Sequence, residues 1–135
     1  MNIEELFGTL QHAVVGTWRK HLKTSKHNVH VILNDFYEDL PDLVDKLIED
    51  YMGVNGKVED YENELSEKDY TAIEYLEKLR EVTKGGYELM NDEPELEADL
   101  DDIVSLIDST LYKLKELTNE NRQIGLMNFL NESLE

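Results

Sequence analysis

The spacing of apolar residues is the feature that most limits what this chain can fold into. Between Pro94 and about Thr118, apolar side chains recur at intervals of three and four residues, the repeat of one face of an α-helix. These positions are Leu96, Leu100, Ile103, Val104, Ile107, Leu111, Leu114 and Leu117. The sequence shows no strand-like alternation of apolar and polar residues. The pattern therefore predicts an all-α fold.

Two stretches nearer the N-terminus carry the same helical repeat. The first begins with Asn2 and Glu5, which suit an N-terminal cap, and continues to residue 21. The second is capped by Thr24 or Ser25 and runs to residue 52, where Gly53 ends it. Pro41 lies inside the second stretch and removes one backbone donor, so we expect one bent helix.

A third region of the chain predicts a loop followed by another helix. The segment GVNGKVEDYENEL has poor periodicity and reads as the longest loop. A helix capped by Ser66 follows it and stops at Gly85 and Gly86, and a short C-terminal helix starts at about Asn119. Four main helices with a short fifth predict an antiparallel four-helix bundle, with residues 1–135 as a single domain.

Charge and composition exclude several classes of function. A formal charge of −18 repels bare nucleic acid, so we expect no direct binding to it, whereas multivalent cations and basic proteins suit the charge. The absence of cysteine excludes disulfides and thiolate metal sites. No apolar run approaches the ~20 residues of a membrane span, and no signal peptide is recognisable. We therefore expect a soluble cytoplasmic protein that does not contact a membrane.

Histidines and carboxylates in the first two predicted helices form a candidate metal site. The segment HLKTSKHNVH contains His21, His27 and His30, and the second helix also carries Asp45 and Glu49. The two acids are four residues apart and so share one helix face. Imidazole nitrogen with carboxylate oxygen is a ligand set that suits iron, zinc or manganese.

Distance prevents one chain from building this site. His30 and Asp45 are 15 residues apart, which is roughly 22 Å along a helix at ~1.5 Å per residue. An antiparallel homodimer would place the histidine end of one helix beside the carboxylate end of its mate. The sequence thus predicts two identical sites, each combining His21 and His30 of one subunit with Asp45 and Glu49 of the partner subunit.

The same residues carry a resemblance to a known family. A histidine at the end of the first helix, followed by H30-x14-D45-x3-E49 on the second, resembles the Dps-like branch of the ferritin superfamily. The match to that branch covers about residues 17–53, and beyond it helix number and length agree. The segment STLYKLKEL on the later helix is similar to small bacteriophage-encoded Dps-like proteins of unassigned function. The resemblance implies a ferritin-like domain with an inter-subunit ferroxidase centre that oxidises Fe(II) with peroxide or oxygen and sequesters it. A dimer and a larger shell both stay open.

Each of these residues also has a simpler interpretation. His21 and His30 suit hydrogen-bonded histidines at a helix junction, and Asp45 and Glu49 suit a solvated helix face. Three other residues lie near the expected centre: His27, a candidate ligand or proton shuttle, Trp18 and Tyr37. Their alternatives are an exposed histidine and core aromatic residues.

A rival function also fits the composition. An acidic viral or regulatory protein on the same dimer scaffold would present negative charge to a basic host protein, with the metal site structural or vestigial. Such a viral protein would act in the host cytoplasm. The location of the acids relative to the histidines distinguishes the two functions.

Overall fold

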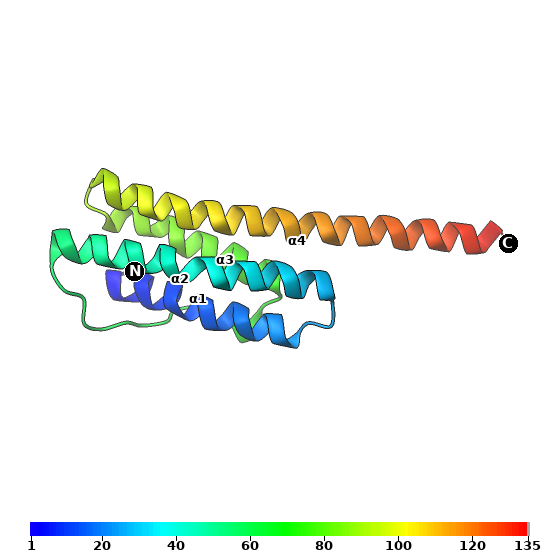
Figure 1. Ribbon diagram of the computed structural model, residues 1–135, viewed down its shortest axis with the longest axis horizontal. Coiled ribbons are helices and arrows are strands. Elements are labelled where there is room, and N and C mark those ends of the chain that lie inside the picture. Colours follow the sequence, from blue (N-terminus) through cyan, green and yellow to red (C-terminus); the bar gives the residue numbers. More distant parts are fainter. Residues whose placement is uncertain (135) are drawn as a thin grey trace.

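Four long helices form the protein (Figure 1). The computed structural model describes the backbone of residues 1–134 and the side chains of residues 1–117. The elements are α1 (Ile3–Lys23), α2 (His27–Asn55), η1 (Glu67–Asp69), α3 (Ala72–Gly85), η2 (Gly86–Leu89) and α4 (Pro94–Leu134), the two η elements being 3₁₀ turns. No strand occurs in residues 1–134, so the all-α prediction is confirmed.

The helices do not simply alternate in direction along the chain. Figure 1 shows α1 and α2 running in opposite directions, α3 keeping the direction of α2, and α4 returning along the bundle. Residues 56–71 therefore form a long crossover that travels back along the bundle between α2 and α3. Both α1 and α4 contact α2 and α3, so each of the four helices has two neighbours.

Local capping fixes where the first and third helices begin. The side chain of Asn2 accepts a hydrogen bond from the backbone N–H of Glu5 at 2.9 Å, as predicted. Ser66 does act as a cap, but only of the single turn η1. A complete capping box formed by Thr71 and Glu74 starts α3, because it satisfies two backbone donors at once.

The second helix is longer than its sequence pattern indicates. It starts at His27 with Lys26 at the N-cap, whereas Thr24 or Ser25 was expected there. It continues through Pro41 as one helix and passes Gly53. Gly56 ends it instead, since its φ of 92° is a left-handed conformation that glycine adopts without strain.

The short fifth helix expected from about Asn119 is wrong as a separate element. α4 runs unbroken from Pro94 to Leu134. No proline or glycine lies between Leu117 and Ile124, so nothing in the backbone chemistry interrupts the helix there. The side chains predicted to be apolar in that segment lie outside the described residues.

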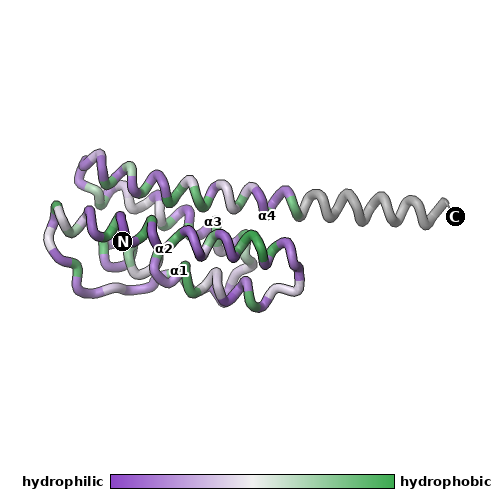
Figure 2. The backbone as a smooth tube through the Cα atoms, in the orientation of Figure 1, coloured by the Kyte–Doolittle hydropathy of each residue, from purple (hydrophilic) through white to green (hydrophobic). Residues whose placement is uncertain are grey.

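Each helix carries apolar residues on one face and polar residues on the other, and the apolar faces meet in one core (Figure 2). The fully buried side chains come from every helix and include Leu6, Phe7, Leu10, Leu33, Phe36, Leu40, Leu47, Tyr75, Leu76, Leu79, Leu96, Leu100, Ile103 and Ile107. Across the described part of the chain, no helix combines the length and the apolar character that crossing a bilayer requires.

The crossover lies directly on the backbone of α1. The N–H of Glu62 donates to the carbonyl of Glu4 at 3.0 Å, and the N–H of Glu64 donates to the hydroxyl of Thr9 at 3.0 Å. Between these contacts, a Cβ added to Gly8 would stand 2.3 Å from the backbone of Glu62. Only a glycine at this position lets the two backbones approach so closely.

Candidate metal site

His21 and His30 form a reciprocal pair where α1 meets α2. The Nδ1 of His21 lies 2.7 Å from the backbone carbonyl of His30, and the Nδ1 of His30 lies 2.9 Å from the carbonyl of His21. Their rings stack with centroids 3.5 Å apart and planes 22° apart. The sequence places one histidine at the end of α1 and the other in the first turn of α2, and the tight turn brings them together.

These contacts fix which nitrogen of each ring carries a proton. A carbonyl oxygen only accepts hydrogen bonds, so both Nδ1 atoms must donate. In the neutral ring the other nitrogen, Nε2, then keeps its lone pair. This is the tautomer of a histidine that binds metal through Nε2 while a carbonyl orients the ring.

Aromatic residues extend outward from the pair. The ring of Tyr37 meets His21 edge-on at 5.2 Å, and its hydroxyl donates to the side-chain oxygen of Asn34 at 2.8 Å. Trp18 lies 6.3 Å from Tyr37 and is 49% exposed, so it is not the core residue that its helical spacing would allow. His27 is exposed, with its ring 6.2 Å from His30.

The carboxylates of the predicted set do not join the histidines within one chain. Asp45 and Glu49 are exposed on α2, far along the helix from His30. Among the described side chains, no third acid or histidine brings a ligand atom within 4.8 Å of ligand atoms of both histidines. This separation is what the sequence predicts for a single subunit.

The surface formed by α1 and α2 is divided by charge. Residues 6–34 contain no acid, whereas residues 35–50 contain seven acids and one lysine. The acid-free half exposes the apolar side chains of Trp18, Leu22 and Val31. A groove of about 290 Å³ lies between the two stretches, lined by Gln11, Val14 and Val15 of α1 and by Pro41, Val44, Asp45 and Ile48 of α2.

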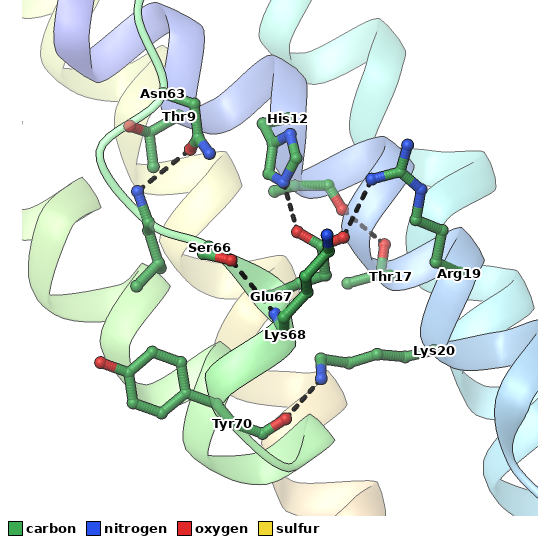
Figure 3. A network of polar contacts seen from close by, with 12 residues as sticks. Thr9, His12, Thr17, Arg19, Lys20, Asn63, Ser66, Glu67, Lys68 and Tyr70 are labelled. Carbon is green, nitrogen blue, oxygen red and sulfur yellow. Dashed lines mark hydrogen bonds and ion pairs between the residues drawn. The ribbon is translucent and has the colours of Figure 1, made fainter.

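Glu67 is a buried acid that the sequence pattern did not reveal (Figure 3). It is 3% exposed, and its carboxylate lies 2.6 Å from His12 Nε2 and 3.0 Å from Arg19 Nη1. Burial raises its pKa, but hydrogen bonds from His12 and Arg19 outweigh burial and lower the pKa to about 2. The crossover is therefore held to α1 by an ionised carboxylate, and His12 has a structural role.

Three acidic side chains gather where the crossover meets the start of α1. Glu5, Glu62 and Glu64 bring carboxylate oxygens within 4.8 Å of one another. Sequence spacing could not reveal this group because it depends on how the crossover folds back. The group is open to solvent and stands at the opposite end of α1 from His21.

A protein-family model matches most of this chain. Neither the curated proteins nor the solved structures contain a match to this chain. The model of a family of unknown function (DUF5856) matches residues 21–114, which include both the histidine pair and the two carboxylates. Because that match covers more than half of the sequence, the chain belongs to this family of unknown function, DUF5856.

Proposed function

We propose that this protein is a Dps-like iron-binding protein whose metal centre lies between two subunits. His21 and His30 of one subunit supply nitrogen ligands, and Asp45 and Glu49 of the partner subunit supply oxygen ligands. This mixed set fits iron, and also zinc or manganese. Fe(II) is the substrate, which gives electrons to peroxide or oxygen and is then sequestered.

The reciprocal histidine pair is the observation that carries the proposal. Two bonds to backbone carbonyls hold the rings, and these bonds use the Nδ1 atoms only. A histidine pair with only a structural role would form the same two bonds. It would have no need of Asp45 and Glu49, the carboxylates that an antiparallel dimer would bring beside it from the partner subunit. The proposal gives the two Nε2 atoms a partner that residues 1–117 of their own chain do not supply.

The surface of α1 and α2 supports the subunit contact that the centre needs. In an antiparallel two-fold pair of α2 helices, the acid-free residues 27–34 of one subunit face acidic residues within 35–50 of the other. The same operation brings the exposed Trp18, Leu22 and Val31 toward the groove beside Asp45. Apolar burial and opposite charges therefore favour the same arrangement.

The order of the helices supports the ferritin-like part of the proposal. Ferritin-like bundles contain one long crossover, whereas the simplest four-helix bundles have short loops throughout. Here the crossover of residues 56–71 joins two helices that run in the same direction (Figure 1). An antiparallel, ferritin-like bundle is the architecture that this order favours.

Mixing two defective variants tests the shared centre directly. We expect H21A/H30A and D45A/E49A each to lose Fe(II) binding in anaerobic calorimetric titrations. Unfolding and refolding them together allows mixed dimers, each with one intact site and one doubly defective site. Random pairing should therefore restore about a quarter of the wild-type metal stoichiometry.

The exposed Asp42 provides a matched control on the same helix. Asp42→Ala removes one acid from α2 outside the four-residue pair and should leave the stoichiometry unchanged. Failure of the mixed sample to bind metal, with both variants folded and dimeric, would contradict a shared centre. Binding that survives Glu49→Ala and Asp45→Ala together would also contradict it.

A second candidate function has one observation in its favour. The exposed acids Asp92, Glu95, Asp101 and Asp102 lie just before and in the first turns of α4. Figure 1 shows the start of α4 at the opposite end of the bundle from the turn between α1 and α2. Acids at that distance do not serve the proposed centre, and they suit contact with a basic protein. Metal binding without peroxide-dependent or oxygen-dependent Fe(II) turnover would favour this function, with the metal holding the dimer together.

A further inference from the structure

A groove of about 530 Å³ lies at the end of the bundle, where the turn between α1 and α2 meets the start of α3. Its apolar lining includes Val29, Ala72 and Ile73. Polar side chains stand at its rim, among them Lys23, Lys26 and Thr71. No acid contributes to its described lining, although acids outnumber bases by 31 to 13 in the chain.

The two lysines of the groove are free to bind a ligand. Within residues 1–117, ion pairs join Arg19 to Glu67, Lys46 to Asp50 and Asp99, Lys78 to Glu81, Arg80 to Asp108, and Lys115 to Glu77. Lys23 and Lys26 are exposed and have no ion-pair partner in that range. An unpaired ammonium group in so acidic a molecule is open to an external anion.

A third lysine increases the concentration of positive charge beside the groove. Lys20 donates to the backbone carbonyl of Tyr70 at 2.5 Å (Figure 3). Burial lowers its pKa below the usual value, the neighbouring Lys23 lowers it further, and the acids Glu67 and Glu74 oppose the change. Cations therefore crowd at this corner of the molecule.

The size and charge of the groove restrict the kind of anion that fits. A charge is screened beyond a Debye length of ~8 Å at physiological salt, so a compact anion responds mainly to the local lysines. A long polyanion such as nucleic acid, or an anionic membrane, would also be repelled by the remainder of a molecule with a charge of −18. The apolar floor favours a ligand that carries an apolar body as well as a charged head.

We propose that this groove binds a small amphipathic anion, with a phosphate or carboxylate head held by Lys23 and Lys26 and a short apolar body against Val29 and Ile73. Thr71 lines the groove, and its hydroxyl can donate a hydrogen bond to the charged head of the ligand. The hydroxyl oxygen accepts from the N–H of Glu74 at 3.2 Å, which leaves the hydroxyl proton available. His21 and His30 flank the turn that forms the groove but do not contribute to its described lining.

Titrating the full chain with octyl phosphate, octanoate and inorganic phosphate tests this site, with amide NMR spectra as the readout. We expect saturable shifts around Val29, Thr71 and Ile73 with an octyl ligand, and weaker binding of inorganic phosphate, which leaves the apolar floor unused. Comparing octyl phosphate with octanoate identifies the preferred head group. Ile73→Ala should weaken the octyl ligands and leave inorganic phosphate unchanged.

Two charge-matched double variants separate a local site from a general charge effect. K23E/K26E should weaken binding by about tenfold or more, because two attractions become repulsions. K57E/K84E changes the net charge equally at exposed lysines outside the groove and should bind as the wild type does. The proposal would be overturned if both double variants weakened binding equally. It would also be overturned if none of the three probes saturated, or if inorganic phosphate bound as tightly as octyl phosphate.

Discussion

Two glycines, each inside a helix, show how the surroundings of one residue set the effect of adding a methyl group. Alanine favours a helix over glycine by about 1 kcal/mol. At Gly53 of α2, an added Cβ would meet no atom within 4 Å, so only that helix preference acts. At Gly8 of α1, the same Cβ would stand 2.3 Å from the backbone of Glu62. The backbone of the crossover cannot move aside as a flexible side chain could.

We therefore predict opposite effects for the two substitutions. Gly53→Ala should raise the free energy of unfolding by about 0.5–1 kcal/mol. Gly8→Ala should lower it by about 2 kcal/mol or more, since displacing packed backbone costs more than the helix preference returns. Urea unfolding followed by circular dichroism measures both. A Gly8→Ala protein as stable as the wild type would show that the crossover does not pack against α1 in solution.

At the scale of elements, the crossover depends on one ionised carboxylate. The pKa of Glu67 is lowered from 4.5 to about 2 in the folded protein. Its stabilising effect is therefore complete above pH ~4.5 and disappears as the pH falls toward ~2. Counted in full, the shift corresponds to ~3 kcal/mol, but half-exposed Arg19 allows solvent to screen the charge, so we expect about 1–2 kcal/mol.

Comparison of Glu67→Gln with the wild type isolates this effect from that of the other acids. At pH 7 the variant should be less stable by about 1–2 kcal/mol, and the difference should shrink between pH 4.5 and 3. Free energies from urea unfolding at several pH values give the comparison. Two curves that stay parallel as the pH falls would rule out an ionised Glu67 as the contact that holds the crossover.

The helices and the crossover differ in how far the sequence alone predicts them. Apolar spacing located all four long helices, because a helix buries one face whatever its neighbours are. It misplaced the ends of α2, because helix ends depend on single residues such as Gly56. It also divided α4 into two helices at about Asn119, where the structure has one. The sequence has no periodic pattern that reveals the role of Glu67 or the close approach of the crossover backbone to Gly8. Both depend on residues that come together only when the crossover folds back onto α1.

The sequence alone also predicts only part of the candidate metal site. Sequence spacing selected His21 and His30, and the turn between α1 and α2 does bring their rings into contact. Spacing could not reveal that each Nδ1 donates to the other residue's carbonyl, which is what leaves Nε2 free. The partners Asp45 and Glu49 stay a prediction, since their contact with the histidines requires a second subunit.

On the scale of the whole molecule, repulsion among acids competes with ion pairs, and added salt weakens both. Most of the ion pairs are exposed, so each contributes at most ~1 kcal/mol. A net charge of −18 means that like charges repel one another throughout the folded protein. Repulsion is therefore the larger of the two effects that salt removes.

We accordingly expect the melting temperature to rise by several degrees between about 20 and 200 mM NaCl, as the Debye length falls from roughly 20 Å to below 8 Å. Calorimetry at fixed protein concentration measures the change. The K57E/K84E variant adds charge without touching the histidine pair, so its melting temperature should depend more steeply on salt. A melting temperature that falls with salt would mean that the ion pairs, and not the repulsion, dominate the electrostatics of this bundle.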